Sequence, residues 1–68
     1  MKKFVVGYLN SFDNVLLQKI VHADSKLDAA KQLMLDQGYI DIEEAFRSIE
    51  HIQEQMFNRD VSLGVIEI

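Results

Sequence analysis

Two histidines and a group of carboxylates are the side chains of this chain best suited to chemistry. Histidine can act as an acid, a base or a metal ligand near neutral pH, but His22 and His51 lie far apart in the sequence. The chain has no cysteine, and Gly7, Gly38 and Gly64 are too scattered for a phosphate-binding loop. No serine lies in a nucleophile elbow. We therefore expect neither catalytic residues nor a metal or cofactor site.

The carboxylates are concentrated in one segment, where Asp41 and Glu44 are followed by Glu50 and Glu54. Calcium ligands need a fixed short spacing around a glycine, which this segment lacks. Helix capping and a solvated helix surface account for all four residues. Imitation of nucleic-acid phosphates stays open as an alternative function.

Three aromatic side chains, Tyr8, Phe12 and Tyr39, are candidates for stacking on unpaired bases. The lysines are interleaved with acidic residues and form no basic groove beside them, so packing in the core or against a turn is the expected role. Phe12 differs because it lies at the tip of the polar segment 10–14, where it has little core to enter. We expect Phe12 to contact a partner protein.

Length and composition indicate one small domain over residues 1–68. A domain of this size buries only about 60% of its unfolded surface, and without cysteine it gains no stability from a disulfide. The hydrophobic fraction of 49% is more than so small a core is expected to hold, which predicts a homodimer or another protein partner. The net charge of −4 disfavours nonspecific binding to nucleic acid and favours a basic protein partner.

The N-terminal segment Met-Lys-Lys-Phe-Val-Val begins like a signal peptide, but its apolar run ends at Leu9 and polar residues follow. No apolar run approaches the roughly 20 residues of a membrane-spanning helix. We therefore expect a cytoplasmic protein with no membrane partner.

Two strands joined by a short turn are expected near the N-terminus. Residues 3–9 are apolar on both alternating faces, which is typical of a strand inside a sheet. Residues 10–14 are rich in Asn, Asp and Ser, which favour turns. Residues 15–23 mix Gln18 and Lys19 with aliphatic residues, which indicates an edge strand.

Two helices are expected next. Ser25 and Asp28 form a variant of the capping box, and Gly38 can end the helix that they begin. A second capping signal, Asp41 with Glu44, predicts that the next helix begins there. Apolar residues then recur at helical spacing and define its buried side: Ile42, Ala45, Phe46, Ile49, Ile52 and Met56.

Residues 61–68 alternate again and predict a closing strand. The expected fold is α+β with the order ββααβ, in which two antiparallel helices return the last strand parallel to the first. We predict a three-stranded sheet of order 2-1-3 with both helices packed on one face. Gly7 and Gly64 lie mid-strand, which indicates bulges or the close approach of a neighbouring strand. The other face would be open and largely aliphatic, so that face or an exposed edge is the expected dimer interface.

The run VHADSKLDAA, in which a strand leads through Asp-Ser into a helix that opens on alanines, is similar to a turn found in many small α+β domains. Taken with its length, its acidity and its Met-Lys-Lys-Phe-Val-Val start, the chain resembles the small accessory proteins of tailed bacteriophages. The resemblance implies a protein that binds and redirects a host enzyme without chemistry of its own. It assigns no functional residues.

The leading hypothesis is a non-enzymatic protein-binding module that forms a homodimer and modulates a further protein. Its expected partner contacts lie near the hairpin and on the acidic helix: Tyr8, Leu9, Phe12, Glu43, Glu50 and Glu54. The alternatives are a nucleic-acid-associated regulator whose dimer builds a groove, a nucleic-acid mimic, and a small-molecule sensor with a pocket between sheet and helices.

Overall fold

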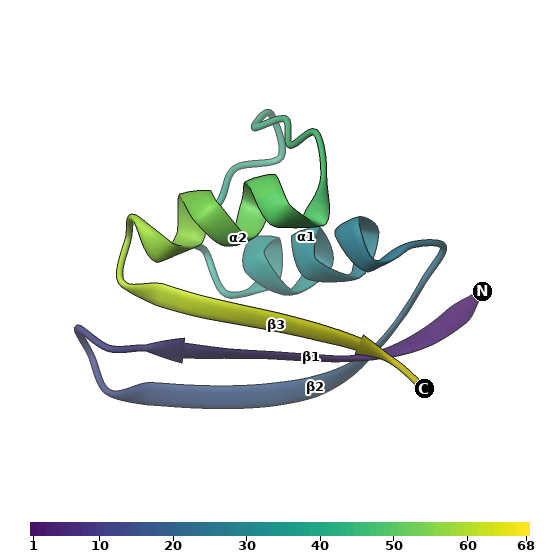
Figure 1. Ribbon diagram of the computed structural model, residues 1–68, viewed down its shortest axis with the longest axis horizontal. Coiled ribbons are helices and arrows are strands. Elements are labelled where there is room, and N and C mark those ends of the chain that lie inside the picture. The colour runs from purple at the N-terminus through teal and green to yellow at the C-terminus, as the bar shows by residue number, and fades with distance from the viewer.

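The computed structural model describes all residues from Met1 to Ile68. The elements follow one another in the order β1 (Lys2–Asn10), β2 (Val15–Ala23), α1 (Lys26–Asp36), α2 (Ile49–Phe57) and β3 (Val61–Glu67). Both helices lie on one face of a three-stranded sheet and leave the other face open (Figure 1). The predicted α+β fold and the strand order β2-β1-β3 are confirmed. No helix has the length and apolar character needed to cross a bilayer.

β1 is the central strand, as its two apolar faces predict. Phe4, Val6 and Tyr8 point toward the helices and are almost completely buried, whereas Val5 and Leu9 alternate with them on the open face. The main core lies between the sheet and the helices. Its largest fully buried side chains come from all layers: Phe4, Val6, Met34, Ile52, Met56 and Val61.

The last strand runs opposite to the predicted direction. β3 pairs with β1 antiparallel, with Val6 opposite Val65 and Gly7 opposite Gly64, so the predicted parallel pairing is wrong. The reason is that α1 and α2 run in broadly the same direction along the sheet, because the connection between them carries the chain back (Figure 1). α2 therefore delivers the chain to the end of the sheet where β1 finishes, and Val61 pairs with Asn10.

The helix predicted to begin near Asp41 begins instead at Ile49. One of the two predicted capping bonds forms, because the Asp41 N–H donates to Glu44 Oε2 at 2.7 Å. The Glu44 N–H donates to the Asp41 backbone carbonyl at 3.1 Å and not to the Asp41 side chain. Arg59 binds the Glu44 carboxylate at 2.9 Å and also donates to the Tyr39 carbonyl at 2.6 Å. These contacts hold residues 39–44 as a turn in an irregular connection, and the helix does not continue from it.

Ser48 is the residue that caps α2. Its hydroxyl accepts from the His51 N–H at 3.1 Å, and the His51 Nδ1 accepts from the Arg47 N–H at 3.1 Å. Ile52 and Met56 are buried as predicted. Ile42, which was expected on the buried side of the helix, lies before it and is 84% exposed. The apolar spacing before residue 49 therefore does not mark a helix.

Ser25 and Gly38 cap α1 as predicted, whereas the Asp28 side chain does not return a bond to the Ser25 N–H. The Ser25 hydroxyl accepts from the Asp28 N–H at 3.1 Å. At the other end Gly38 has a φ of +81°, a left-handed conformation that glycine adopts without a steric penalty. The Tyr39 N–H donates to the Met34 carbonyl and the Gly38 N–H to the Leu35 carbonyl, which is the Schellman arrangement of a helix C-terminus.

Candidate functional site

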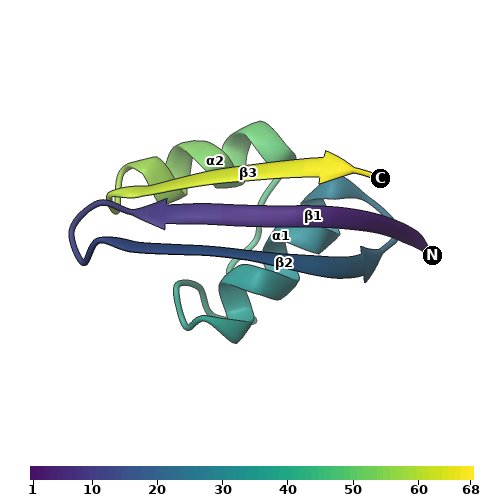
Figure 2. The ribbon, with the colours of Figure 1, turned by 90° about the horizontal axis from the view of Figure 1, so that it is seen from below.

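The open face of the sheet gathers half of the exposed large hydrophobic side chains of the chain. Strand pairing arranges its residues in four rows that run from β2 through β1 to β3. In order along the strands, the rows are His22–Lys3–Ile68, Ile20–Val5–Ile66, Gln18–Gly7–Gly64 and Leu16–Leu9–Ser62. We define these twelve residues as the outer face. Figure 2 views the sheet from this side, with the helices behind the strands.

The outer face is shaped as a trench beside an aliphatic ridge. The ridge is the row Ile20–Val5–Ile66, and the trench is the next row, where Gly7 and Gly64 have no side chains. A hollow of about 260 Å³ opens there. Its β2 end is closed by Gln18, whose Cγ lies 3.1 Å from the point that a Cβ on Gly7 would occupy. The two mid-strand glycines thus face each other across an unbroken register and mark no bulge.

The outer face carries no side-chain carboxylate. Its two ionisable side chains, Lys3 and His22, share the row at one end of the sheet. The acidic residues lie elsewhere, on the helices, on the turns and connections, and at Glu67, which lies opposite Phe4 and therefore on the helix-facing side. Negative charge is therefore concentrated away from the outer face.

A glutamine from each helix covers a carbonyl at each edge of the sheet. Gln53 Nε2 donates to the Leu63 carbonyl at 3.0 Å, and Gln32 Nε2 donates to the His22 carbonyl at 3.4 Å. Both carbonyls belong to positions that point away from β1, since the bond from the Ile68 N–H to the Lys3 carbonyl fixes the alternation. An incoming strand would have to displace these side chains, so both edges are partly protected.

Phe12 lies at the tip of the β1–β2 turn and is 81% exposed, as its place in a polar turn predicts. The turn itself is held by Asn10, which is buried at the end of β1. The Asn10 Oδ1 accepts from the N–H groups of Phe12 and Asp13 at 3.0 Å each. Its Nδ2 donates to the Tyr39 hydroxyl at 2.9 Å. The aromatic tip is therefore presented on a fixed backbone.

Tyr8 lies in the core and not at the surface. Its side chain is 3% exposed and packs edge-on against Tyr39, with ring centroids 5.2 Å apart. It has no surface to offer a partner, which leaves Leu9 and Phe12 as the predicted contacts at this end of the molecule. Tyr8, Tyr39 and Phe12 form no common platform, because the first is covered by the helices and the last is on the turn.

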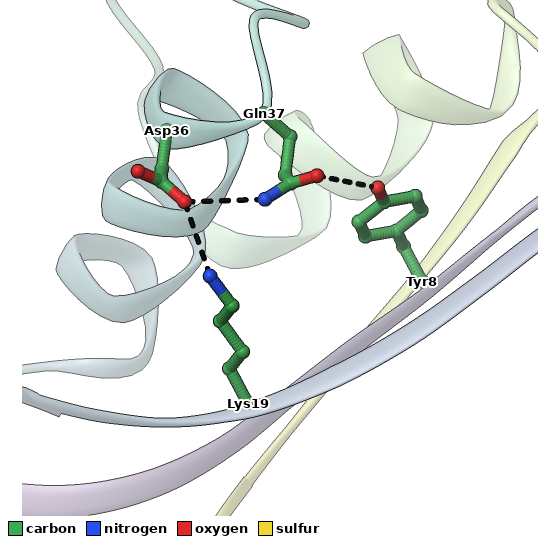
Figure 3. A network of polar contacts seen from close by, with 4 residues as sticks. All are labelled: Tyr8, Lys19, Asp36 and Gln37. Carbon is green, nitrogen blue, oxygen red and sulfur yellow. Dashed lines mark hydrogen bonds and ion pairs between the residues drawn. The ribbon is translucent and has the colours of Figure 1, made fainter.

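The Tyr8 hydroxyl begins a chain of polar contacts that ties the sheet to α1 (Figure 3). It donates to Gln37 Oε1 at 3.0 Å, and Gln37 Nε2 donates to Asp36 Oδ2 at 3.1 Å. Lys19 on β2 binds the same carboxylate oxygen at 3.3 Å. Burial raises the pKa of Tyr8, and the neighbouring Tyr39 hydroxyl adds to the shift. The network explains why a lysine lies on the helix-facing side of β2.

The predicted acidic contacts are all exposed but do not share one element. Glu50 and Glu54 lie one turn apart on α2, whereas Glu43 lies in the connection before that helix. Glu44 is bound within the chain, and the Asp41 N–H, followed by the Arg59 guanidinium, lowers the pKa of its carboxyl group. No group of three His, Cys, Asp or Glu side chains is arranged to hold a metal ion. His22 is on the outer face and His51 on α2, so the fold does not bring them together.

Several exposed apolar residues were not among the predicted contacts. Leu16, Ile20 and Ile66 lie on the outer face, and the alternation of each strand already places them together on the side opposite the core. Phe57 ends α2 and is 70% exposed; no sequence signal separates it from the buried positions of that helix.

The fold thus presents an apolar outer face, a fixed aromatic tip and an acidic side of α2. Comparisons of this chain with protein-family models, with curated proteins and with solved structures found no match.

Proposed function

We propose that this chain is a protein-binding module whose main binding surface is the outer face. The observation that supports the proposal is the exposure of adjoining aliphatic side chains on a rigid sheet: Leu16 is 74% exposed, Ile66 66% and Ile20 59%. Burial of apolar surface contributes roughly 25 cal/mol of free energy for each Å² removed from water, and surface left exposed lacks this contribution. Contiguous exposed apolar surface of this kind is typical of interaction sites.

A second contact region serves a further protein, whose behaviour the binding modulates without chemistry by this chain. It consists of Phe12 at the hairpin tip together with Glu50 and Glu54 on α2. Because Asn10 already fixes the turn, little conformational entropy is lost when Phe12 is buried against a partner. The exposed carboxylates favour a basic protein surface and speed its approach.

The resemblance to bacteriophage accessory proteins suggests a host enzyme as that further protein. A cytoplasmic location is part of the same proposal, because a chain without cysteine needs no oxidising compartment to fold. Fractionation of cells that express the protein tests the location directly.

Two exposed isoleucines give a matched test of the outer face. Ile20 lies on it and Ile42 lies on the connection away from it, so Ile20→Glu and Ile42→Glu make the same chemical change at exposed positions. We expect Ile20→Glu to lose most crosslinking to other protein chains and Ile42→Glu to retain it. Equal crosslinking by the two variants would contradict the assignment of the outer face.

The second region is tested by replacing Phe12 and Glu50 together, as Phe12→Ala and Glu50→Gln. We expect this double variant to lose capture of the modulated protein while its association through the outer face is unchanged. Capture at the wild-type level would remove the hairpin tip and the acidic side of α2 from the proposal.

A further inference from the structure

We propose that the outer face is covered by a second copy of this chain, packed sheet against sheet. In this arrangement Val5 and Ile66 of each ridge lie in the Gly7–Gly64 trench of the other copy, and Ile20 lies against Gln18, which closes the β2 end of that trench. The inference rests on the proposed function, since it names the occupant of the same surface. Its basis is the row pattern, the charge distribution and the protected edges of the sheet.

The row pattern is self-complementary about one particular two-fold axis. Ridge and trench are neighbouring rows, separated by two residues or about 6.8 Å along the strands. An axis that runs parallel to the rows and midway between these two places each ridge opposite the trench of the other copy. Ile66 then faces Gly64 of the second copy, and Val5 faces Gly7. Each glycine row receives the aliphatic side chains that it lacks, as an isologous contact requires.

The same axis keeps the basic groups apart. It sets the row that contains Lys3 and His22 against the row of Leu9 and Leu16 in the second copy. The two basic ends therefore lie at opposite ends of the pair, and the aliphatic stem of Lys3 can pack while its ammonium group stays in water. A two-fold axis parallel to the strands would instead place Lys3 against Lys3, so the axis across the strands is favoured.

Charge makes the outer face the suitable surface for self-association. Each copy carries a net charge of −4, and two copies that meet through acidic surfaces repel each other. The outer face has no acidic side chain, so it allows close approach with less of that repulsion. Pairing through the sheet edges is disfavoured, because Gln53 and Gln32 already occupy a carbonyl at each edge.

The size of the face predicts a reversible dimer. The seven paired residues of β1 and β3 and the three strands give a planar footprint of about 24 by 14 Å on each copy. Two such footprints total about 670 Å², which is below the roughly 1,200 Å² at which standard specific interfaces begin and is typical of weak, transient association. We therefore expect a dissociation constant of the order of 1–100 μM.

Sedimentation velocity across a dilution series of the whole protein tests the proposal, over about 1 μM to about 1 mM, the range that brackets this affinity. We expect the mass to rise from 7.9 kDa toward twice that value. Ile20→Glu would bury a carboxylate in the pair and weaken it by at least about 100-fold. The matched change Ile42→Glu would leave association unchanged. A wild-type protein that is monomeric throughout the series would overturn the proposal.

A second pair of variants distinguishes specific packing in the trench from nonspecific hydrophobic association. Gly64→Leu fills the trench, and the folded monomer has room for it, since no atom lies within 4 Å of the added Cβ. Ser62→Leu adds the same side chain to the neighbouring row of the outer face, at the edge of the hollow and not between the two glycines. We expect Gly64→Leu to weaken the dimer at least about tenfold through overpacking, and Ser62→Leu to maintain or strengthen it. If both variants strengthen association, the ridge-in-trench arrangement is wrong.

Failure of this inference can be told from failure of the proposed function. A monomeric wild-type protein whose crosslinking to other proteins still depends on Ile20 would refute self-pairing and support the binding role of the outer face. A dimer that Ile20→Glu does not weaken would refute self-pairing through the outer face, and crosslinking to other proteins that Ile20→Glu also leaves unchanged would refute the proposed function as well. Circular dichroism of each variant at the lowest concentration establishes that the monomer is folded.

Discussion

Replacement of Asn10 by alanine is the sharpest test of how the hairpin tip is held. Asn10 is 5% exposed and makes three well-formed side-chain hydrogen bonds. Two are accepted from the N–H groups of Phe12 and Asp13, and one is donated to the Tyr39 hydroxyl. Asn10→Ala removes all three hydrogen bonds at once and leaves the backbone of β1 in place.

The expected loss follows from the net value of each bond. A protein hydrogen bond contributes about 1 kcal/mol net, and the turn amides can bond water in its place, so the total loss is about 2–3 kcal/mol. A single core in a chain of this length rarely supplies more than about 3–5 kcal/mol of net stability. Asn10→Ala should therefore remove most of the stability and leave a measurable unfolded population without denaturant.

Urea unfolding followed by circular dichroism measures this loss. The protein concentration is held fixed, because self-association would contribute to the apparent stability. Tyr39→Phe serves as the control, since it removes only the hydroxyl that Asn10 contacts and should cost about 1 kcal/mol. Once Asn10 is alanine, adding Tyr39→Phe should change the free energy of unfolding by less than about 0.5 kcal/mol.

Two outcomes would refute this reasoning. A loss of less than about 0.5 kcal/mol for Asn10→Ala would mean that water replaces all three bonds without cost. A loss equal to that of Tyr39→Phe would mean that the bonds to Phe12 and Asp13 contribute nothing and that the tip is not fixed by this side chain.

Two further predictions concern the segment around the connection. Gly38→Ala should lower the free energy of unfolding by about 1 kcal/mol, because φ is +81° there and alanine disfavours that conformation. No atom lies within 4 Å of the added Cβ, so no steric clash adds to this cost. Urea titration measures the loss, and an unchanged midpoint would contradict the conformational cost. The Glu44 carboxyl has a pKa below its ordinary value, so its stabilising effect is fully present above the pKa of glutamate in the unfolded chain and is lost as the pH falls through the lower pKa of the folded state. Glu44→Gln should flatten this acid-side decline in thermal midpoint, and an identical pH profile would show that the contacts with Asp41 and Arg59 do not contribute.

The parts of the fold that the sequence predicts correctly depend on neighbours a few residues apart. Alternation over residues 3–9 and 15–23 identifies the two faces of each strand, because the side-chain period of a strand is two. Ser25 and Gly38 bound α1 through contacts that span three to five residues. All the residues that such a pattern needs lie within the same short segment, so the sequence alone is enough to recognise it.

The connection between the helices could not be predicted in this way. Of the capping signal at Asp41 and Glu44, the bond from the Asp41 N–H to the Glu44 side chain is present, but the Asp41 side chain does not cap the Glu44 N–H. The turn that forms there also involves Arg59, which is fifteen residues further along the chain and binds Glu44 and the Tyr39 carbonyl, a contact that no local pattern contains. The direction of β3 depends on the same connection. Because the connection carries the chain back to the side where α1 begins, the two helices run the same way and β3 starts beside the end of β1 (Figure 1).

The predicted partner contacts near the hairpin could be only partly identified from the sequence, for a related reason. Tyr8 and Leu9 are adjacent in β1, so they point to opposite faces and cannot both belong to one surface. Alternation separates these two sets of residues, but only the placement of the helices determines which set is covered. The helices cover the side of Tyr8, and Leu9 is left on the outer face.

The trench in the outer face depends on the feature that local patterns predicted wrongly. Gly7 faces Gly64 because β3 is antiparallel to β1 in one particular register. A shift of two residues would set Gly64 opposite Val5 or Leu9 and divide the trench, and a shift of one would turn Gly64 toward the helices. Contacts at the two ends of the strand pair hold the register, where the Ser11 N–H donates to the Asp60 carbonyl and the Ile68 N–H to the Lys3 carbonyl. The turn at Asp60, which has a φ of +62°, therefore lies at one end of the contacts that align Gly7 with Gly64, although it is not part of the outer face.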